Sequence, residues 1–136
     1  MAEDASYALQ VAHRNALLAA SAVTDLVSTR IYDYVPEREV FPYIELGASS
    51  TQEWDTSTDF GAQHLVTFHV WSRAEGKKEA LAICRAIKET LRNNTALALT
   101  DHNLVNMQFL LSDVIRDNDG QSYHGVVQYR AITEEN

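Results

Sequence analysis

The stretch that decides the fold spans residues 63–91 and reads QHLVTFHVWSRAEGKKEALAICRAIKETL. Its first ten residues alternate with a period of two, and the even positions carry Val66, Phe68 and Val70, which predicts a strand with that face on the core. From Lys77 onward the apolar residues fall at helical spacings, namely at Ala80, Ile83, Cys84, Ile87 and Leu91. Ser72 and Glu75 stand three residues apart before this run, which favours a capping box. We therefore predict a strand that turns sharply into a helix lying back on its own sheet.

The length and composition of the chain indicate a single globular domain over residues 1–136. The hydrophobic fraction of 46% is ordinary for such a domain. No apolar run approaches the ~20 residues of a membrane span, and the start of the chain is acidic rather than basic as in a signal peptide. We therefore expect folding in the cytosol and no membrane association. The single cysteine, Cys84, excludes an intramolecular disulfide, and its place on the apolar helix face predicts a buried small hydrophobe.

The charge balance argues against a surface that grips nucleic acid. The chain has 19 acidic and 11 basic residues, which gives a net charge of -8. A DNA-binding face needs a basic stripe, which this composition does not favour. The same charge is compatible with DNA that passes nearby without being held.

The first thirty residues predict one long helix and one short helical turn. Residues 7–20 are rich in Ala and Leu and lack Gly and Pro, so we expect a helix with Asp4 or Ser6 as its N-cap. His13 lies close to the apolar stripe of this helix, and we interpret it as a surface residue at the edge of the core. The short turn is expected within residues 21–29.

Two extended segments follow. Residues 30–36 are short and end at Pro36, while residues 41–47 predict a strand with Pro42 at its start, where a missing N–H is tolerated. We expect Ile44 to face inward in this strand together with Leu46.

The segment from Gly47 to Ala62 shows no regular period, although residues 48–53 could continue the preceding strand. Residues 54–61 predict a polar loop, and long loops without structure of their own tend to be functional or disordered. The two large aromatic residues in this loop either fold back on the sheet or anchor a partner. The candidate interface residues are Trp54, Asp55, Thr56, Asp59 and Phe60.

Two further strands are predicted at residues 104–115 and 122–133. The turn between them, residues 116–120, reads RDNDG, and its Asn, Asp and Gly tolerate positive φ. We expect one face of the first strand to hold Val105, Met107, Phe109 and Leu111, and one face of the second to hold Val127, Tyr129 and Ala131. Together these elements predict an α+β fold: a mostly antiparallel sheet of about four strands with two helices packed on one face.

No local pattern predicts catalysis, a metal or a cofactor. Residues 117–120 match part of a calcium loop, but Ile115 and Val126 stand where ligands are required, so we favour a hairpin turn. His64 and His69 are separated by an odd number of residues, so they lie on opposite strand faces and cannot share a metal. The common metalloprotease, nucleophile-elbow and phosphate-loop motifs are absent. We expect no enzyme, although a small enzyme or binding module built from scattered residues stays open as an alternative.

Several short blocks between Leu9 and Thr133 occur in an order and with gaps that resemble a known family. They follow the first helix and are residues 30–33 (RIYD), 41–44 (FPYI), 54–55 (WD), 69–73 (HVWSR), 78–80 (KEA) and 124–130 (HGVVQYR). They resemble the short tail-completion proteins of tailed phages, prophages and gene transfer agents, which are similar to tail terminators. The resemblance implies an α+β sandwich with helices on one side of a mostly antiparallel sheet.

The resemblance also implies a structural function and a set of partners. A tail terminator caps the head-proximal end of the finished tail tube, stops its growth and offers a joining surface to the head. The family works as a hexameric ring around the DNA channel. The implied partners are further copies of the chain, the major tail tube protein and a head-side connector or stopper protein. Such a protein acts in the host cytoplasm during assembly and then resides in the particle.

Two interpretations accompany this expectation. An acidic ring lining would repel DNA phosphates and let the genome slide without specific binding, although ordinary solubility explains the same charge. A head-completion or connector protein of the same particle neck, also a ring, is the alternative function.

Overall fold

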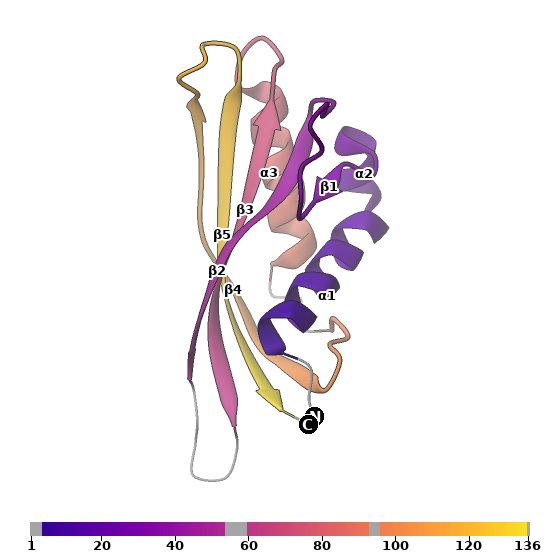
Figure 1. Ribbon diagram of the computed structural model, residues 1–136, viewed down its shortest axis with the longest axis vertical. Coiled ribbons are helices and arrows are strands. Elements are labelled where there is room, and N and C mark those ends of the chain that lie inside the picture. Colours follow the sequence, from indigo (N-terminus) through magenta and orange to yellow (C-terminus); the bar gives the residue numbers. More distant parts are fainter. Residues whose placement is uncertain (1–3, 54–59, 93–95, 136) are drawn as a thin grey trace.

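The computed structural model describes residues 4–53, 60–92 and 96–135. In chain order its elements are α1 (Ala5–Ala19), α2 (Ser21–Val27), β1 (Ile31–Tyr32), β2 (Tyr43–Glu53), β3 (Gly61–Ser72), α3 (Lys78–Leu91), β4 (His102–Arg116) and β5 (Tyr123–Glu135). The strands form a sheet in the order β1-β2-β3-β5-β4. All neighbouring strands are antiparallel except β1, which runs parallel to β2. Figure 1 shows α1, α2 and α3 on one face of this sheet, so these elements leave the other face open.

The α+β class is as predicted, but the sheet is mixed and larger than expected. In place of about four strands and two helices, the described residues form five strands and three helices. The additional strand is β1, in which Ile31 pairs with Ile44, and two residues are too few to show a period. The additional helix is α2, where a short turn was predicted, and its Val23 and Val27 are fully buried. Within the described part of the chain, no helix combines the length and apolar character needed to cross a membrane.

The strand-to-helix unit at the centre is confirmed. The even face of β3 and the apolar stripe of α3 are buried in one cluster with Tyr129 of β5, and Phe109 of β4 packs against that cluster. This cluster lies between the sheet and the helices. It contains the predicted core residues Val66, Phe68, Val70, Ile83, Ile87 and Tyr129.

The predicted capping box is wrong. α3 begins at Lys78 without a side-chain cap bond. Ser72 ends β3, and its hydroxyl donates to Glu79 Oε1 at 2.7 Å and accepts the N–H of Ala74 at 3.2 Å. A loop separates Ser72 from the helix. Ser72 therefore links the end of β3 to Glu79 in the first turn of α3, and it does not pair with Glu75.

The first helix begins at one of the two predicted caps. The Asp4 carboxylate accepts the N–H of Tyr7 at 3.2 Å. Further along, Arg14 Nε–H donates to the carbonyl of Ile31 at 3.0 Å. This bond ties the second half of α1 to β1, the edge strand of the sheet.

His13 is buried, contrary to its interpretation as a surface residue. Its side chain is 1% exposed, and its ring lies edge-on to Phe68 with 5.5 Å between the ring centroids. Neither ring nitrogen has a hydrogen-bond partner. The physical reason is its position four residues from both Leu9 and Leu17, which places it within the buried stripe of α1 and not beside it.

Most of the expected irregular segment from Gly47 to Ala62 is strand. β2 continues to Glu53, and β3 already begins at Gly61. The pairing register shifts between Leu46 and Ser49, and this bulge hides the strand because it interrupts the alternation of faces. Ile44 and Leu46 face inward and are buried, as predicted.

β4 departs from its predicted pattern because it contains two bulges. Val105 and Leu110 are extra residues in its pairing with β5. A bulge changes which residues face inward, so Val105 and Leu111 are exposed although both were predicted to share a face with Met107. The apolar residues that β4 does bury are Leu104, Met107 and Val114, and its first residue, His102, is buried as well.

The predicted turn between β4 and β5 is confirmed. The N–H of Asp117 donates to the carbonyl of Ser122 at 2.8 Å. Gly120 has φ 74, a value that favours glycine. The Asp119 carboxylate accepts the N–H groups of Gln121 and Ser122, each at 2.8 Å, so the acidic residues build a turn.

Candidate functional site

His64 and His69 face opposite sides of β3, as predicted. His64 lies on the covered side, where its Nε2 is 2.9 Å from Thr133 Oγ1 and its Nδ1 is 3.2 Å from Thr51 Oγ1. Both ring nitrogens are thus occupied by hydroxyl groups, which makes His64 a structural residue. Within residues 4–53, 60–92 and 96–135, no three histidine, cysteine or acidic side chains are placed to hold a metal ion.

His13 and His64 line a small pocket beneath α1. Its volume of about 20 Å³ suits one water molecule and is too small for a substrate. Burial, and to a smaller extent the nearby His64, lower the pKa of His13 to about 3. His13 is therefore neutral at physiological pH.

Cys84 has the properties of a buried hydrophobe, as predicted. Its thiol is free and 2% exposed. Burial raises the pKa of the Cys84 thiol, and a hydrogen bond from Ser112 opposes that shift only in part. Because a nucleophilic cysteine requires the thiolate, this setting does not activate it.

The open face of the sheet carries an ordered cluster of aromatic and imidazole rings. His69 Nδ1 lies 2.7 Å from His124 Nε2. The His124 ring stacks on Trp71 with 4.1 Å between centroids and an interplanar angle of 3°. Trp71 Nε1–H donates to Glu45 Oε1 at 3.2 Å. Gly47 leaves room for this cluster, since a Cβ at this position would come within 2.6 Å of the His69 ring.

Strand register brings this cluster together. Glu45 pairs with His69 across β2 and β3, and Trp71 pairs with His124 across β3 and β5. Burial, and then the nearby His69, lower the pKa of His124. In a hydrogen bond between two imidazoles, one nitrogen must be the acceptor. The two rings therefore cannot both be imidazolium cations in this geometry. The sequence leaves His124 isolated, because strand register is not visible in a single chain.

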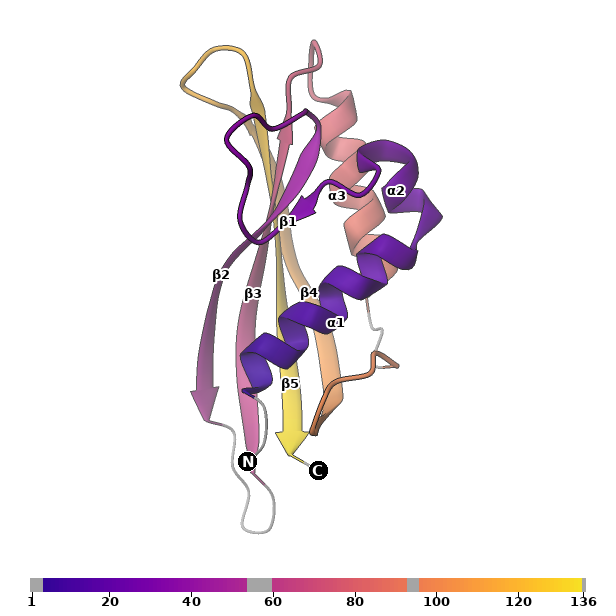
Figure 2. The ribbon, with the colours of Figure 1, turned by 45° about the vertical axis from the view of Figure 1, so that its right-hand side comes forward.

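Of the candidate interface residues, only Phe60 is described, and it lies at one end of the molecule, next to the start of β3. Trp54, Asp55, Thr56 and Asp59 lie outside the described residues. Phe60 is described and 67% exposed, and its carbonyl accepts the N–H of Glu135 at 3.0 Å. Figure 2 shows that the end of β2, the start of β3, the end of β5 and the start of α1 share this end.

A depression of about 390 Å³ opens beside Phe60. Its lining includes Glu53, His102 and Glu135, so apolar and acidic groups adjoin there. The exposed Phe60 ring and this depression form a surface feature and not an enclosed site.

Comparison with known proteins identifies the class to which this fold belongs. The family model described as tail completion protein gp17 matches residues 12–134. The tail completion protein gp17 of Bacillus phage SPP1 is 27% identical over 132 residues, which cover 97% of this chain and 96% of that protein.

Two solved structures agree with this match. One is a chain in the virion of a native gene transfer agent particle, with a TM-score of 0.88 and 28% identity over 96% of this chain and 97% of that chain. The other is the gp17 protein of bacteriophage SPP1, with a TM-score of 0.63 and 28% identity over 93% of this chain and 89% of that chain.

The chain belongs to the tail completion protein gp17 family. The related proteins are structural components of virions and not enzymes. The protein is accordingly a structural tail-completion protein of a phage or gene transfer agent particle.

Proposed function

We propose that this protein is the tail terminator of its particle. It caps the head-proximal end of the tail tube, stops tube polymerisation and forms the surface to which the head is joined. The observation that carries the proposal is the TM-score of 0.88 to a chain of an assembled gene transfer agent virion, over nearly the whole of both chains. Membership of the tail completion family supports the same position in the particle.

The proposed working form is a closed ring of six copies around the DNA channel. It assembles in the host cytoplasm, with the major tail tube protein on one side and a connector or stopper protein on the other. The net charge of -8 supports free passage of the genome, because an acidic lining repels phosphate and holds no DNA. No catalytic group takes part in this function.

The end of the β2–β3 hairpin is the proposed contact with a neighbouring particle protein. The proposed contact residues are Trp54, Asp55, Thr56, Asp59 and Phe60. The exposed ring of Phe60 supports this proposal, because a partner that covers it gains free energy from the apolar area removed from water.

Electron microscopy of particles from a strain that lacks the gene tests the proposal. A missing terminator leaves tail tubes of uncontrolled, excessive length and heads without tails, and the wild-type gene restores both. Tails of normal length that fail to join heads would instead assign the protein to the head-side connector. Normal, joined particles would reject both functions.

A further inference from the structure

The two edges of the sheet both expose apolar side chains. β4 forms one edge, and the large apolar residues that it leaves more than two-fifths exposed are Val105, Leu110, Leu111 and Ile115. β1 forms the opposite edge, and the connection that follows it exposes Tyr34 and Val40. Single exposed hydrophobic residues are ordinary, but an apolar edge strand favours association. Two different patches at opposite edges are what a head-to-tail ring of identical chains requires.

A groove with a basic lining adjoins the β4 edge. It lies between α3 and β4 and has a volume of about 380 Å³. Its apolar lining includes Leu81 and Phe109, and Lys88 Nζ lies 4.4 Å from the Phe109 ring centroid. The charged lining consists of Arg85, Lys88, Glu89 and Arg92. Three cations and one anion stand out on a chain whose net charge is -8.

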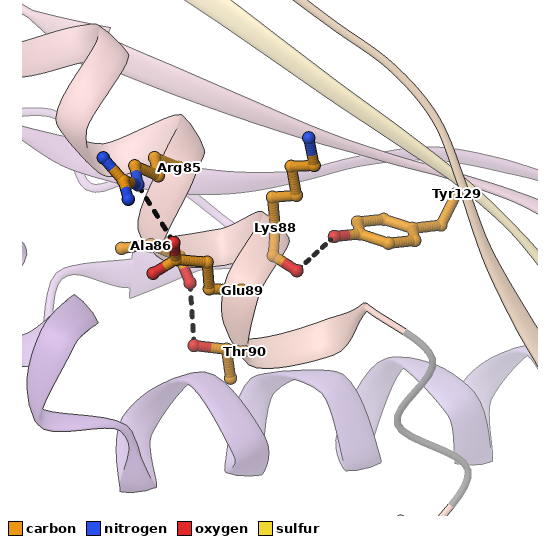
Figure 3. Close-up of polar contacts among 6 residues, drawn as sticks. All are labelled: Arg85, Ala86, Lys88, Glu89, Thr90 and Tyr129. Carbon is orange, nitrogen blue, oxygen red and sulfur yellow. Dashed lines mark hydrogen bonds and ion pairs between the residues drawn. The ribbon is translucent and has the colours of Figure 1, made fainter.

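Core contacts hold the groove in shape. The Tyr129 hydroxyl of β5 donates to the carbonyl of Lys88 at 3.0 Å, which fixes α3 above the sheet (Figure 3). On the solvent side of α3, Arg85 Nε pairs with Glu89 Oε1 at 2.9 Å (Figure 3). Because Glu89 is matched by Arg85, the positive charge without an opposite partner in the lining comes from Lys88 and Arg92.

The segment at the opposite edge has the complementary composition. Residues 33–40 read DYVPEREV, with three acidic residues and one basic residue. Tyr34 is 88% exposed, and Asp33 and Glu37 are also exposed. Pro36 restricts the backbone, which lowers the entropy lost when the segment is bound. An aromatic ring flanked by carboxylates matches a groove with an aromatic floor flanked by cations.

We propose that residues 33–40 of one copy of the chain dock in the α3–β4 groove of the next copy. Tyr34 packs against Leu81 and Phe109, while Asp33 and Glu37 face Lys88 and Arg92. The contact is heterologous, so repeating it from copy to copy builds a head-to-tail assembly, which closes into the proposed ring when the rotation between copies divides a full turn. This inference rests on the proposed function, because it assigns the subunit interface of the proposed ring.

Cysteine crosslinking in assembled particles tests the contact. The variant with Tyr34→Cys and Leu81→Cys should, on mild oxidation of purified particles, give a ladder of crosslinked species up to six copies. The matched control, Tyr34→Cys with Thr67→Cys, places the second thiol on the open sheet face and should give no ladder. A non-specific crosslinker applied to wild-type particles shows independently whether a ring is present. A ring without the Tyr34–Leu81 crosslink would overturn the interface and leave the proposed function standing; absence of any ring would overturn both.

Charge reversal provides a second test. The variant K88E/R92E and the variant D33K/E37K should each lower the yield of joined particles at least tenfold, because each places like charges across the contact. The combination of all four substitutions should restore at least a third of the wild-type yield. Thermal unfolding of each purified variant establishes that it folds. Folded variants that each assemble normally, or a combination that is no better than its parts, would contradict the contact.

Discussion

The two faces of β3 carry the same chemical group in opposite settings. On the covered face, His64 is held by two threonine hydroxyls, and His13 is buried beside it without a partner. On the open face, His69 bonds to His124, which stacks on Trp71 at a partly exposed surface. Helices cover only one face, so packing there determines the stability of the fold. Side chains such as Leu65 on the open face, Ile115 on the β4 edge and Phe60 near the start of β3 stay exposed to solvent.

Removing the largest side chain of β3 from the covered face should have the largest effect on stability. Phe68→Ala should lower the free energy of unfolding by about 3–5 kcal/mol, because it leaves a cavity in the buried cluster. Thr67→Ala, on the open face, is the matched control and should cost less than about 1 kcal/mol. Denaturant unfolding measures both, and a loss below about 1 kcal/mol for Phe68→Ala would mean that this face does not form the core.

His13 makes stability depend on pH. Its pKa in the folded state, about 3, lies below the ordinary value of 6.5, so below pH 6.5 the unfolded chain binds more protons than the folded one. Stability is therefore complete above pH 6.5 and falls as the pH drops toward 3, by about 3 kcal/mol at pH 4 from this residue. His13→Leu should remove this part of the acid sensitivity and keep the fold at pH 7.

Parallel unfolding curves at pH 7, 5 and 4 measure the difference between the wild type and H13L. The same loss of stability with falling pH in both proteins would show that His13 is not the group responsible.

On the open face, Trp71→Ala should shift the pKa of His124 and should have only a small effect on the stability of the fold. Removal of the stacked indole exposes the His124 ring, so the lowered pKa of His124 should rise toward its ordinary value. The loss of stability should be about 1 kcal/mol, because the cluster is only partly buried. An NMR titration of the imidazole resonances gives the pKa, and an unchanged value would show that stacking does not shield His124.

At the hairpin end, Trp54→Ala with Phe60→Ala should have the smallest effect on stability and a large effect on assembly. The fold should stay intact, while tails become overlong or fail to join heads in electron micrographs. A double variant that unfolds at room temperature would make these aromatics core residues. A folded variant that still gives joined tails of normal length would remove the proposed contact.

Periodicity predicted the part of the fold that depends on local pattern. The β3–α3 unit and the β4–β5 turn follow directly from spacing and turn chemistry. For His13, the polar residue type predicts exposure while the spacing from Leu9 and Leu17 predicts burial, and the spacing decides its place in the fold.

Other features depend on the pairing of distant segments and were not predictable from the sequence. The bulges at Val105 and Leu110 change which residues of β4 face inward, and no residue pattern in the sequence predicts them. The contact between His69 and His124 depends on the register of β3 against β5. The groove between α3 and β4 appears only when Lys88 and Phe109 are brought together by the fold.

The most direct measurement of the central claim is the structure of the intact particle at the junction of head and tail. If the protein is a tail terminator, that structure should show six copies of this chain in a single ring at the head-proximal end of the tube. The ring should contact the last ring of the tube and surround the DNA. The same chain found at the opposite end of the tail, or in a ring separated from the tube by another protein, would contradict that claim.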